Sequence, residues 1–169
     1  MATIYLMGYM GSGKSTLGRK IANLLNYNFI DLDEEIEKKA GVSIEEIFER
    51  EGEKYFRRLE SEQLAATAGK KDTVISLGGG TPCSNENIEF IKKHGFSIYI
   101  KLPAKALYQR LTNAKIKRPL LKNISGNKLL EFIDKQLKER ELYYEQADYI
   151  VDIHHNSAKD IVARLNEVL

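Results

Sequence analysis

A glycine-rich loop near the N-terminus constrains the fold of this chain more than any other feature. Residues Gly8–Ser15 read G-Y-M-G-S-G-K-S and match the pattern G-x-x-x-x-G-K-[ST] in full. The apolar run Thr3–Met7 precedes the loop, and a helical pattern over Ser15–Leu25 follows it. Glycines allow successive backbone N–H groups to point into one concavity, and the N-terminus of a helix adds further donors. The sequence therefore predicts a loop that binds the phosphates of a nucleoside triphosphate.

The side chains of this loop have separate expected tasks. Lys14 is expected to reach the β- and γ-phosphates, and the hydroxyl of Ser15 is expected to bind Mg²⁺. A glycine-rich turn that matches by chance is the alternative, which the flanking strand and helix disfavour. The motif alone does not separate kinases from switches, motors or ATPases. The expected ATP-binding residues of the loop and the helix after it are Gly11, Ser12, Gly13, Lys14, Ser15 and Thr16.

Strand and helix patterns alternate along the rest of the chain. Alternation of this kind predicts an α/β fold in which a parallel sheet is covered by helices on both faces. Ligands of such folds bind beyond the carboxyl ends of the strands. Strands are expected at Thr3–Met7, Asn28–Asp31, Thr73–Leu77, Phe96–Leu102 and Tyr149–Ile153. Helices are expected at Ser15–Leu25, Glu35–Lys39, Ile44–Glu51, Lys54–Ala68, Ile88–Lys93, after Pro103, at Asn127–Tyr144 and at Ala158–Val168.

Length and composition narrow the class of protein. The 169 residues and a hydrophobic fraction of 43% suit one domain over 1–169. A net charge of +2 gives no general reason to expect a nucleic-acid or membrane partner, and no apolar run is long enough to span a bilayer. The single cysteine, Cys83, excludes an intrachain disulfide. A reducing compartment, hence the cytoplasm, is the expected location.

Two acids stand at the end of the second expected strand. If that strand continues, alternation sends Asp31 and Asp33 to the same side. The third expected strand, Thr73–Leu77, ends in glycines and supplies no acid. Asp31 is therefore the candidate carboxylate for Mg²⁺, through water, and Asp33 is left to orient a substrate hydroxyl or to accept its proton. The alternative is that both acids only stabilise the N-terminus of the next helix.

Two helical arginines suggest an anionic substrate. Arg57 shares a helix face with Glu60, and Arg140 shares one with Tyr144. Guanidinium groups bind carboxylates through paired hydrogen bonds. The alternative is a solvated surface salt bridge, and spacing alone does not choose between Arg57 and Arg58.

One segment concentrates positive charge. Residues 113–124 contain Pro119 and four basic residues without an acid, which predicts a mobile lid over about 112–124 that closes on ATP. A solvated loop or a weak nucleic-acid patch is the alternative. The run has no aromatic residue on which a base would stack, which weakens the nucleic-acid version.

Taken together, these motifs resemble the shikimate kinase family. They occur in the expected order over most of the chain, and their combination is far more specific than any one of them. The matching residues are Gly8–Ser15, the pair Asp31 and Asp33, Phe56-Arg57-x-x-Glu60, Gly78–Gly80, Arg118-Pro119-Leu120, and Arg140 with Tyr144. The resemblance implies a three-layer P-loop NTPase fold like that of nucleoside-monophosphate kinases. It implies a five-stranded parallel sheet of order 2-3-1-4-5, a helical substrate-binding region over about 32–60, and a mobile lid.

The resemblance also implies a reaction, the phosphorylation of the 3-hydroxyl of shikimate by ATP in aromatic amino-acid biosynthesis. It selects Arg57 over Arg58, gives the substrate carboxylate to Arg57 and Arg140, and makes Glu60 the group that orients Arg57. Asp33 and Gly79 are implied to contact shikimate as well. The full set of implied substrate-binding residues is Asp33, Arg57, Glu60, Gly78, Gly79, Gly80 and Arg140.

On the nucleotide side, the resemblance implies one Mg²⁺ ion held by Ser15 and Asp31, with ATP as co-substrate. Arg118 would reach the phosphates from the lid, and Arg110 would lie against the adenine. The implied catalytic residues are Asp33, Lys14 and Arg118. A monomer that binds small molecules is expected.

Three rival functions stay open on the sequence. A gluconate kinase of the same fold also acts on a hydroxylated carboxylate. A GTPase would need N-K-x-D, but Asn127-Lys128 is followed by two leucines. A non-catalytic nucleotide-binding module would be expected to lose Lys14, Asp33 or the arginines, which are all present.

Overall fold

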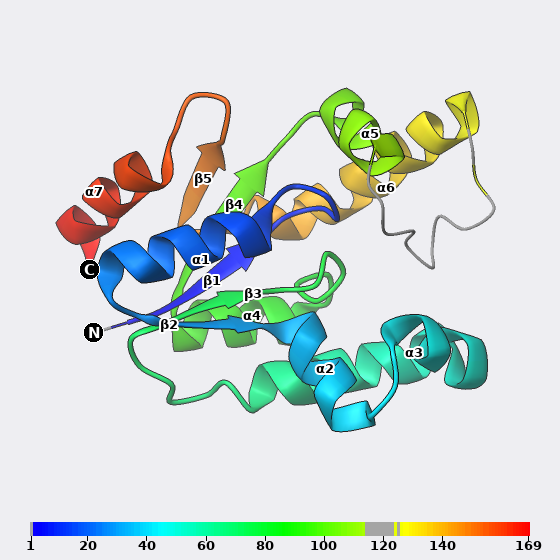
Figure 1. The fold of residues 1–169 in the computed structure, drawn as a ribbon, viewed down its shortest axis with the longest axis horizontal. Helices are drawn as coiled ribbons and strands as arrows, with labels where there is room; N and C mark the ends of the chain where they lie inside the picture. The colour runs from blue at the N-terminus through cyan, green and yellow to red at the C-terminus, as the bar shows by residue number, and fades with distance from the viewer. Residues whose placement is uncertain (1, 114–123, 125) are drawn as a thin grey trace.

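The computed structural model describes residues 2–113, 124 and 126–169. Five strands form one parallel sheet in the order β2-β3-β1-β4-β5 (Figure 1). This is the expected order 2-3-1-4-5, so the predicted topology is confirmed. The strands are β1 (Thr3–Met7), β2 (Asn28–Asp31), β3 (Thr73–Ser76), β4 (Phe96–Lys101) and β5 (Tyr149–Asp152).

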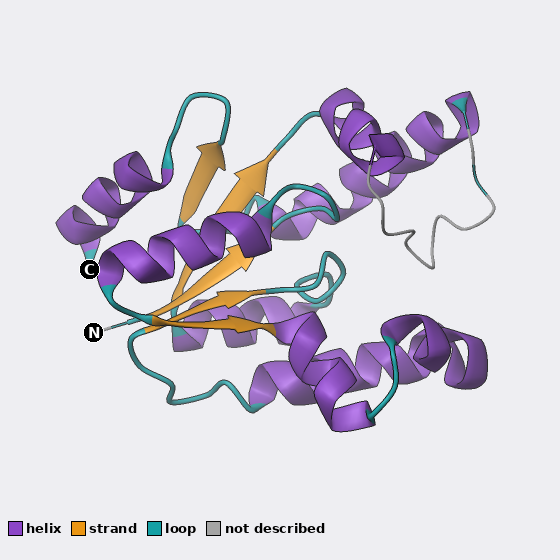
Figure 2. Ribbon diagram, viewed as in Figure 1, coloured by secondary structure: helices purple, strands orange, loops and turns teal. Residues whose placement is uncertain are grey.

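Helices cover the sheet on both faces, which makes three layers (Figure 2). The predicted helices are all present, with ends that move by a few residues. They are α1 (Lys14–Leu25), α2 (Leu32–Ala40), α3 (Ile44–Ala65), α4 (Asn85–His94), α5 (Ala104–Asn113), α6 (Asn127–Tyr144) and α7 (Ala158–Val168).

Alternation along the central strand β1 divides the core into two layers. Ile4 and Leu6 pack on one face against α1 and α7, with Ile21 and Leu165 among their neighbours. Tyr5 and the other side chains of the opposite face pack against α3, α4, α5 and α6. All side chains of β1 and of its neighbour β3 are buried, which explains why these two strands read as apolar runs without polar alternation.

The pairing register brings the ends of three strands together. Ser76 of β3 lies opposite Asp31 of β2 and opposite Leu6 of β1. Because the strands are parallel, the loops that follow them leave the sheet at one edge. Gly8–Ser15 after β1 and Gly78–Gly80 after β3 therefore lie next to each other.

The structure corrects one local expectation. Strand β2 ends at Asp31, and helix α2 begins at Leu32 rather than near Glu35. Strand alternation therefore does not relate Asp31 to Asp33, because Asp33 lies in the first turn of a helix. Asp31 caps that helix by accepting a hydrogen bond from the backbone N–H of Asp33 at 3.1 Å.

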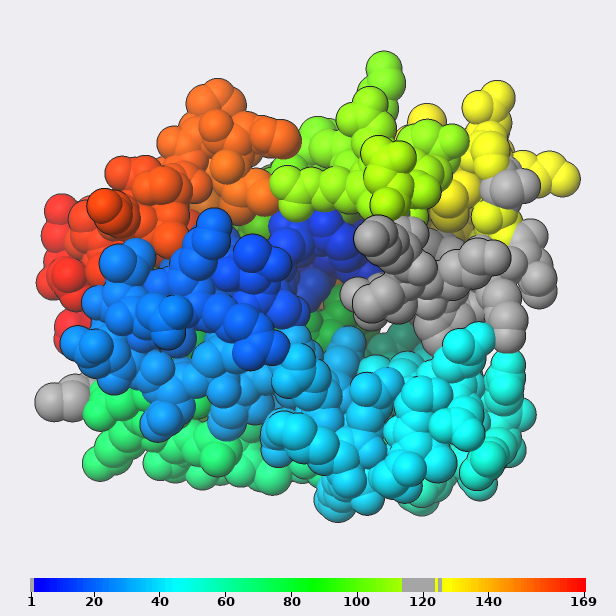
Figure 3. All heavy atoms as spheres, in the orientation of Figure 1, coloured from blue at the N-terminus to red at the C-terminus, as the bar shows by residue number. Residues whose placement is uncertain are grey.

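Helices α2 and α3 form a smaller unit beside the sheet, with its own apolar cluster of Ile36, Ile47 and Phe56. In the space-filling view they form the cyan surface at the lower right, across from the yellow-green surface of α5 and α6 (Figure 3). Gly52 breaks α3 into the two helices that the sequence predicted, with φ 81° and ψ 174°. Residues 114–123 of the predicted lid lie outside the described residues.

We expect Gly52→Ala to destabilise the fold by about 1–3 kcal/mol, because φ 81° with ψ 174° is a backbone region that only glycine adopts readily. Gly41→Ala is the matched control, since Gly41 lies at φ 72° and ψ 7°, in the milder left-handed region. A methyl group would meet no atom within 4 Å at either position. Urea unfolding that gives equal losses for both variants would contradict the expectation.

Candidate active site

A cavity of about 540 Å³ opens beyond the carboxyl ends of β1, β2 and β3. It lies between the phosphate loop, the α2–α3 unit and helix α6. Its walls combine acids, two arginines and the backbone of Gly78–Gly80, the glycine turn that follows β3. The lining residues are Met10, Ser15, Asp31, Asp33, Glu34, Glu37, Ser43, Ile44, Glu45, Phe48, Phe56, Arg57, Glu60, Gly78, Gly79, Gly80 and Arg140.

The phosphate loop has a compact internal structure. Lys14 is buried, and its ammonium group donates hydrogen bonds to the carbonyl oxygens of Gly8 at 2.8 Å and Tyr9 at 3.0 Å. Gly13 adopts a left-handed conformation at the N-terminus of α1, where the free backbone donors of the helix face the loop. Arg110 donates to the carbonyl oxygen of Ser12 at 3.1 Å, so α5 supplies a cation beside the loop. Thr16 lies exposed on the first turn of α1.

The side-chain oxygens of Ser15, Asp31 and Ser76 meet where the phosphate loop touches the ends of β2 and β3. The hydroxyl of Ser15 donates to the carboxylate of Asp31 at 2.5 Å and lies 3.3 Å from the hydroxyl of Ser76. Hydroxyl and carboxylate oxygens suit Mg²⁺, which keeps several of its waters. The residues present therefore fit the predicted metal role of Ser15 and Asp31. The sequence analysis missed Ser76, whose position depends on strand register.

Arg57 is held by two glutamates of its own helix. Its guanidinium donates to Glu60 at 2.5 Å and to Glu53 at 3.0 Å. Burial lowers the pKa of Arg57, but the attraction and hydrogen bonds of Glu60 and Glu53 outweigh burial and raise the pKa above its usual value. By contrast, Arg58 lies on the surface beside Glu62 and does not line the cavity. The structure thus brings Arg57, and not Arg58, into the cavity.

The pair of Arg57 and Glu60 is not the solvated surface bridge that the sequence left open. The side chain of Glu60 is only 2% exposed, whereas that of Arg57 is 30% exposed. The second carboxylate oxygen of Glu60 accepts a hydrogen bond from the hydroxyl of Thr81 at 2.7 Å. Asn87 in turn donates to the carbonyl oxygen of Thr81 at 2.7 Å, which ties the turn after β3 to α4.

Arg140 enters the cavity from the opposite side, on α6. Its side chain is almost fully buried, and among the described residues its Nη1 atom has no hydrogen-bond partner. Tyr144, one turn later, donates from its hydroxyl to the carbonyl oxygen of Gly79. A buried guanidinium nitrogen without a partner is costly, so this atom is suited to bind an anion that enters the cavity.

The glycine turn lets all of these groups converge. A methyl group at Gly78 would lie 2.6 Å from a Glu60 carboxylate oxygen and 2.8 Å from one of Asp33. At Gly79 it would lie 3.2 Å from Nη1 of Arg140, and at Gly80 it would lie 2.2 Å from Nη1 of Arg57. The charged side chains therefore pack directly on a backbone that carries no side chains of its own.

Cys83 follows this turn but does not line the cavity. Burial raises the pKa of its thiol to about 11, even though Arg140 and Arg57 act in the opposite direction. The thiol is therefore protonated at neutral pH and is a poor nucleophile.

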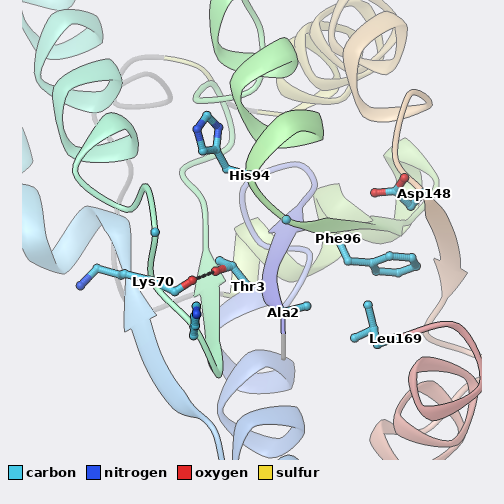
Figure 4. A pocket seen from close by; sticks show the side chains of 10 residues that line it. Ala2, Thr3, Lys70, His94, Phe96, Asp148 and Leu169 are labelled. Carbon is cyan, nitrogen blue, oxygen red and sulfur yellow. Dashed lines mark hydrogen bonds between the residues drawn. The ribbon is translucent and has the colours of Figure 1, made fainter.

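A second hollow of about 400 Å³ lies at the amino ends of the strands (Figure 4). Thr3, Phe96 and Asp148, which stand at or just before the starts of β1, β4 and β5, are among its lining residues. Ligands of parallel α/β folds bind at the opposite edge, where the phosphate loop lies. None of the helices within the described ranges combines the length and apolar character needed to cross a bilayer.

Comparisons with known proteins show the family of this chain. The family model described as shikimate kinase matches residues 10–169. The chain belongs to the shikimate kinase family. A shikimate kinase of Flavobacterium johnsoniae is 40% identical over 171 residues, which cover 100% of this chain and 99% of the relative. Membership makes the chain an ATP-dependent kinase that works with a divalent metal ion.

Solved structures of the shikimate kinase family have the same fold. The enzyme of Bacteroides thetaiotaomicron is 38% identical with a TM-score of 0.89, over 99% of this chain and 97% of that one. The enzyme of Acinetobacter baumannii, solved in complex with shikimate, is 36% identical with a TM-score of 0.88, over 99% of this chain and 92% of that one. A gluconokinase of Sinorhizobium meliloti is 19% identical with a TM-score of 0.60, over 98% of this chain and 94% of that one, which shows a shared fold alone.

We expect Thr81→Val to destabilise the protein by about 1–3 kcal/mol, because a buried Glu60 oxygen loses its hydrogen-bond donor. Thr81→Ser restores the hydroxyl and most of the stability. Thr73→Val is the matched control and should cost less, since Thr73 is also buried but its hydroxyl donates to the carbonyl oxygen of the exposed Lys71, away from the cavity. Urea unfolding measures all three variants, and wild-type stability in Thr81→Val would refute the contact.

Proposed function

We infer that this chain transfers the γ-phosphoryl group of ATP to the 3-hydroxyl of shikimate, in the route to aromatic amino acids. The observation that carries the proposal is the convergence of Arg57, Arg140 and Asp33 on the glycine turn beside the phosphate loop. Two guanidinium groups suit an organic acid, and a carboxylate beside the same turn suits its hydroxyl. The similarity of the chain to shikimate kinases over its full length supports shikimate, rather than another hydroxy acid, as its substrate.

In the proposed reaction, Arg57 and Arg140 hold the carboxylate of shikimate and so fix the direction of its ring. Asp33 accepts a hydrogen bond from the 3-hydroxyl and directs the oxygen at the γ-phosphorus. The oxygen–phosphorus bond forms, the bond from that phosphorus to the bridging oxygen of ADP breaks, and the hydroxyl proton passes to Asp33 or to solvent. The loose transition state of phosphoryl transfer demands little base strength, so the main task of Asp33 is orientation.

On the nucleotide side, the loop amides of Gly11, Ser12 and Gly13 bind the phosphates, and Lys14 turns from its carbonyl partners to the β- and γ-phosphates. Ser15 and Asp31 hold one Mg²⁺ ion, which when bound neutralises charge on the phosphates.

Several expectations from the sequence remain proposals. Arg118, which lies outside the described residues, is proposed to reach the phosphates from the lid over about 112–124. Arg110 is proposed to lie against the adenine, and its place beside Ser12 is compatible with this role. We propose one domain over 1–169 with its substrate region at about 32–60, acting as a monomer. We also propose a cytoplasmic location, where ATP is available.

The direct test is a coupled assay of ADP release with a panel of hydroxy acids and with ATP or GTP as donor. We expect turnover with ATP and shikimate that requires Mg²⁺ and stops when the metal is chelated. Turnover of gluconate without turnover of shikimate would refute the proposal, and a preference for GTP would revive the GTPase alternative.

We expect Arg57→Ala to raise the KM for shikimate by at least about 10-fold with little change in the KM for ATP, because a charge-assisted contact to the carboxylate is worth about 1.5–3 kcal/mol. Arg58→Ala is the matched control, because its side chain lies outside the cavity. Steady-state kinetics of both variants measure the difference. An unchanged KM for shikimate in Arg57→Ala would contradict the role.

We expect Asp33→Asn to lower kcat by about 100-fold or more while ATP affinity stays within about twofold, because the side chain faces the hydroxyl and not the phosphates. The change keeps the size of the side chain and the helix turn that carries it. Single-turnover kinetics and nucleotide titration measure the two effects separately. Equal losses in both would argue against this assignment.

A further inference from the structure

Tyr9 joins the phosphate loop to the wall of the cavity that carries Arg140. It is the second residue of the loop, and its side chain is 1% exposed. The guanidinium carbon of Arg140 lies 5.2 Å from the centre of the Tyr9 ring, within the range of a cation–π contact. Tyr9 does not line the cavity itself. The ring therefore supports the arginine from behind, on the side away from the open space.

The hydroxyl of Tyr9 fixes the orientation of that ring. It donates a hydrogen bond of 2.6 Å to the side-chain oxygen of Gln136. Gln136 stands one helical turn before Arg140 on α6, so one tyrosine contacts two successive turns of this helix. Burial raises the pKa of Tyr9 to about 12, although Arg140 acts in the opposite direction. The hydroxyl is therefore protonated at neutral pH and stays a donor to Gln136.

The backbone of Tyr9 belongs to the nucleotide side of the site. Its carbonyl oxygen accepts hydrogen bonds from the ammonium group of Lys14 at 3.0 Å and from the backbone N–H of Ser12 at 3.1 Å. The same residue thus contacts the lysine of the phosphate loop and the arginine that the proposed function assigns to the substrate carboxylate.

We propose that Tyr9 is a positioning residue for the acid substrate: its ring holds the guanidinium of Arg140 in the direction that receives the carboxylate. The inference rests on the proposed function for the identity of that acid. An arginine side chain has many rotamers, and within the described residues Nη1 of Arg140 has no hydrogen-bond partner. The face of the Tyr9 ring, which Gln136 fixes, contributes to the selection of a rotamer together with the neighbouring hydroxyl of Tyr144.

The test compares Tyr9→Leu, which removes the aromatic face, with Tyr9→Phe, which keeps it. We expect Tyr9→Leu to raise the KM for shikimate about 3- to 30-fold and to leave the KM for ATP within about twofold. Tyr9→Phe should change the KM for shikimate by less than about threefold. Tyr5→Leu is the matched control for the loss of a buried tyrosine, since Tyr5 packs in the same layer of the core but its hydroxyl bonds to Thr67.

The methyl ester of shikimate separates positioning from general damage to the fold. The ester lacks the negative charge that Arg140 would receive, so Tyr9→Leu should bind it as well as the wild type does, within about twofold. An equal loss for acid and ester, or an equal rise in the KM for ATP, would overturn the inference. So would an unchanged KM for shikimate in a folded Tyr9→Leu variant.

Two further measurements keep the test decisive. If Tyr9→Leu does not fold, Tyr9→Met removes the aromatic face with a more adaptable side chain and should raise the KM for shikimate about 3- to 30-fold, whereas an unchanged KM in that variant would overturn the inference. The wild type is assayed first with the hydroxy-acid panel. If it uses another acid and not shikimate, the proposed function fails, and the Tyr9 variants are tested with that acid and its ester.

Discussion

The close approach of charged side chains to the turn Gly78–Gly80 is the constraint on which the rest of the site depends. A methyl group at any of these glycines would meet a carboxylate or a guanidinium within 2.2–3.2 Å. This turn follows β3. Because the sheet order places β3 next to β1, the backbone of the turn also lies against the phosphate loop. The absence of side chains at three successive positions thus makes the space in which an acid substrate meets a nucleotide.

Charge in this space is arranged so that little of it is left uncompensated in the protein core. Glu60 is buried, but it accepts from Arg57 on one oxygen and from Thr81 on the other. Removing one partner of such a buried pair costs about 3–5 kcal/mol. The network therefore stabilises the fold as well as the arrangement of the site. Arg140 differs, since in the described part of the chain the face of the Tyr9 ring lies against its guanidinium and no salt bridge to a carboxylate is found. Its positive charge is thereby kept available for a ligand.

The sequence predicted those parts of the molecule that depend on local pattern. The phosphate loop, the five strands and their helices follow from glycine spacing and apolar periodicity, and the sheet order followed from the family resemblance. It predicted the end of β2 at Asp31 but not the start of α2 at Leu32, because an aspartate that caps a helix has extended backbone angles, as the last residue of a strand does. The contacts of Thr81 with Glu60 and of Tyr9 with Gln136 join residues 21 and 127 positions apart, so no window of the sequence reveals them. Spacing likewise left Arg57 and Arg58 equivalent, since only the packing of α3 decides which of them is covered.

The two carboxylate oxygens of Asp31 contact different parts of the site. One carboxylate oxygen begins helix α2 by accepting from the backbone of Asp33, and the other accepts from the hydroxyl of Ser15. A helix N-cap tolerates serine, threonine or asparagine as readily as aspartate. A site for a divalent cation asks for negative charge as well as an oxygen. Under the proposed metal role, the serine or asparagine that a helix cap accepts would lose the charge at this position, so natural variation there should be far narrower than its partly exposed position suggests.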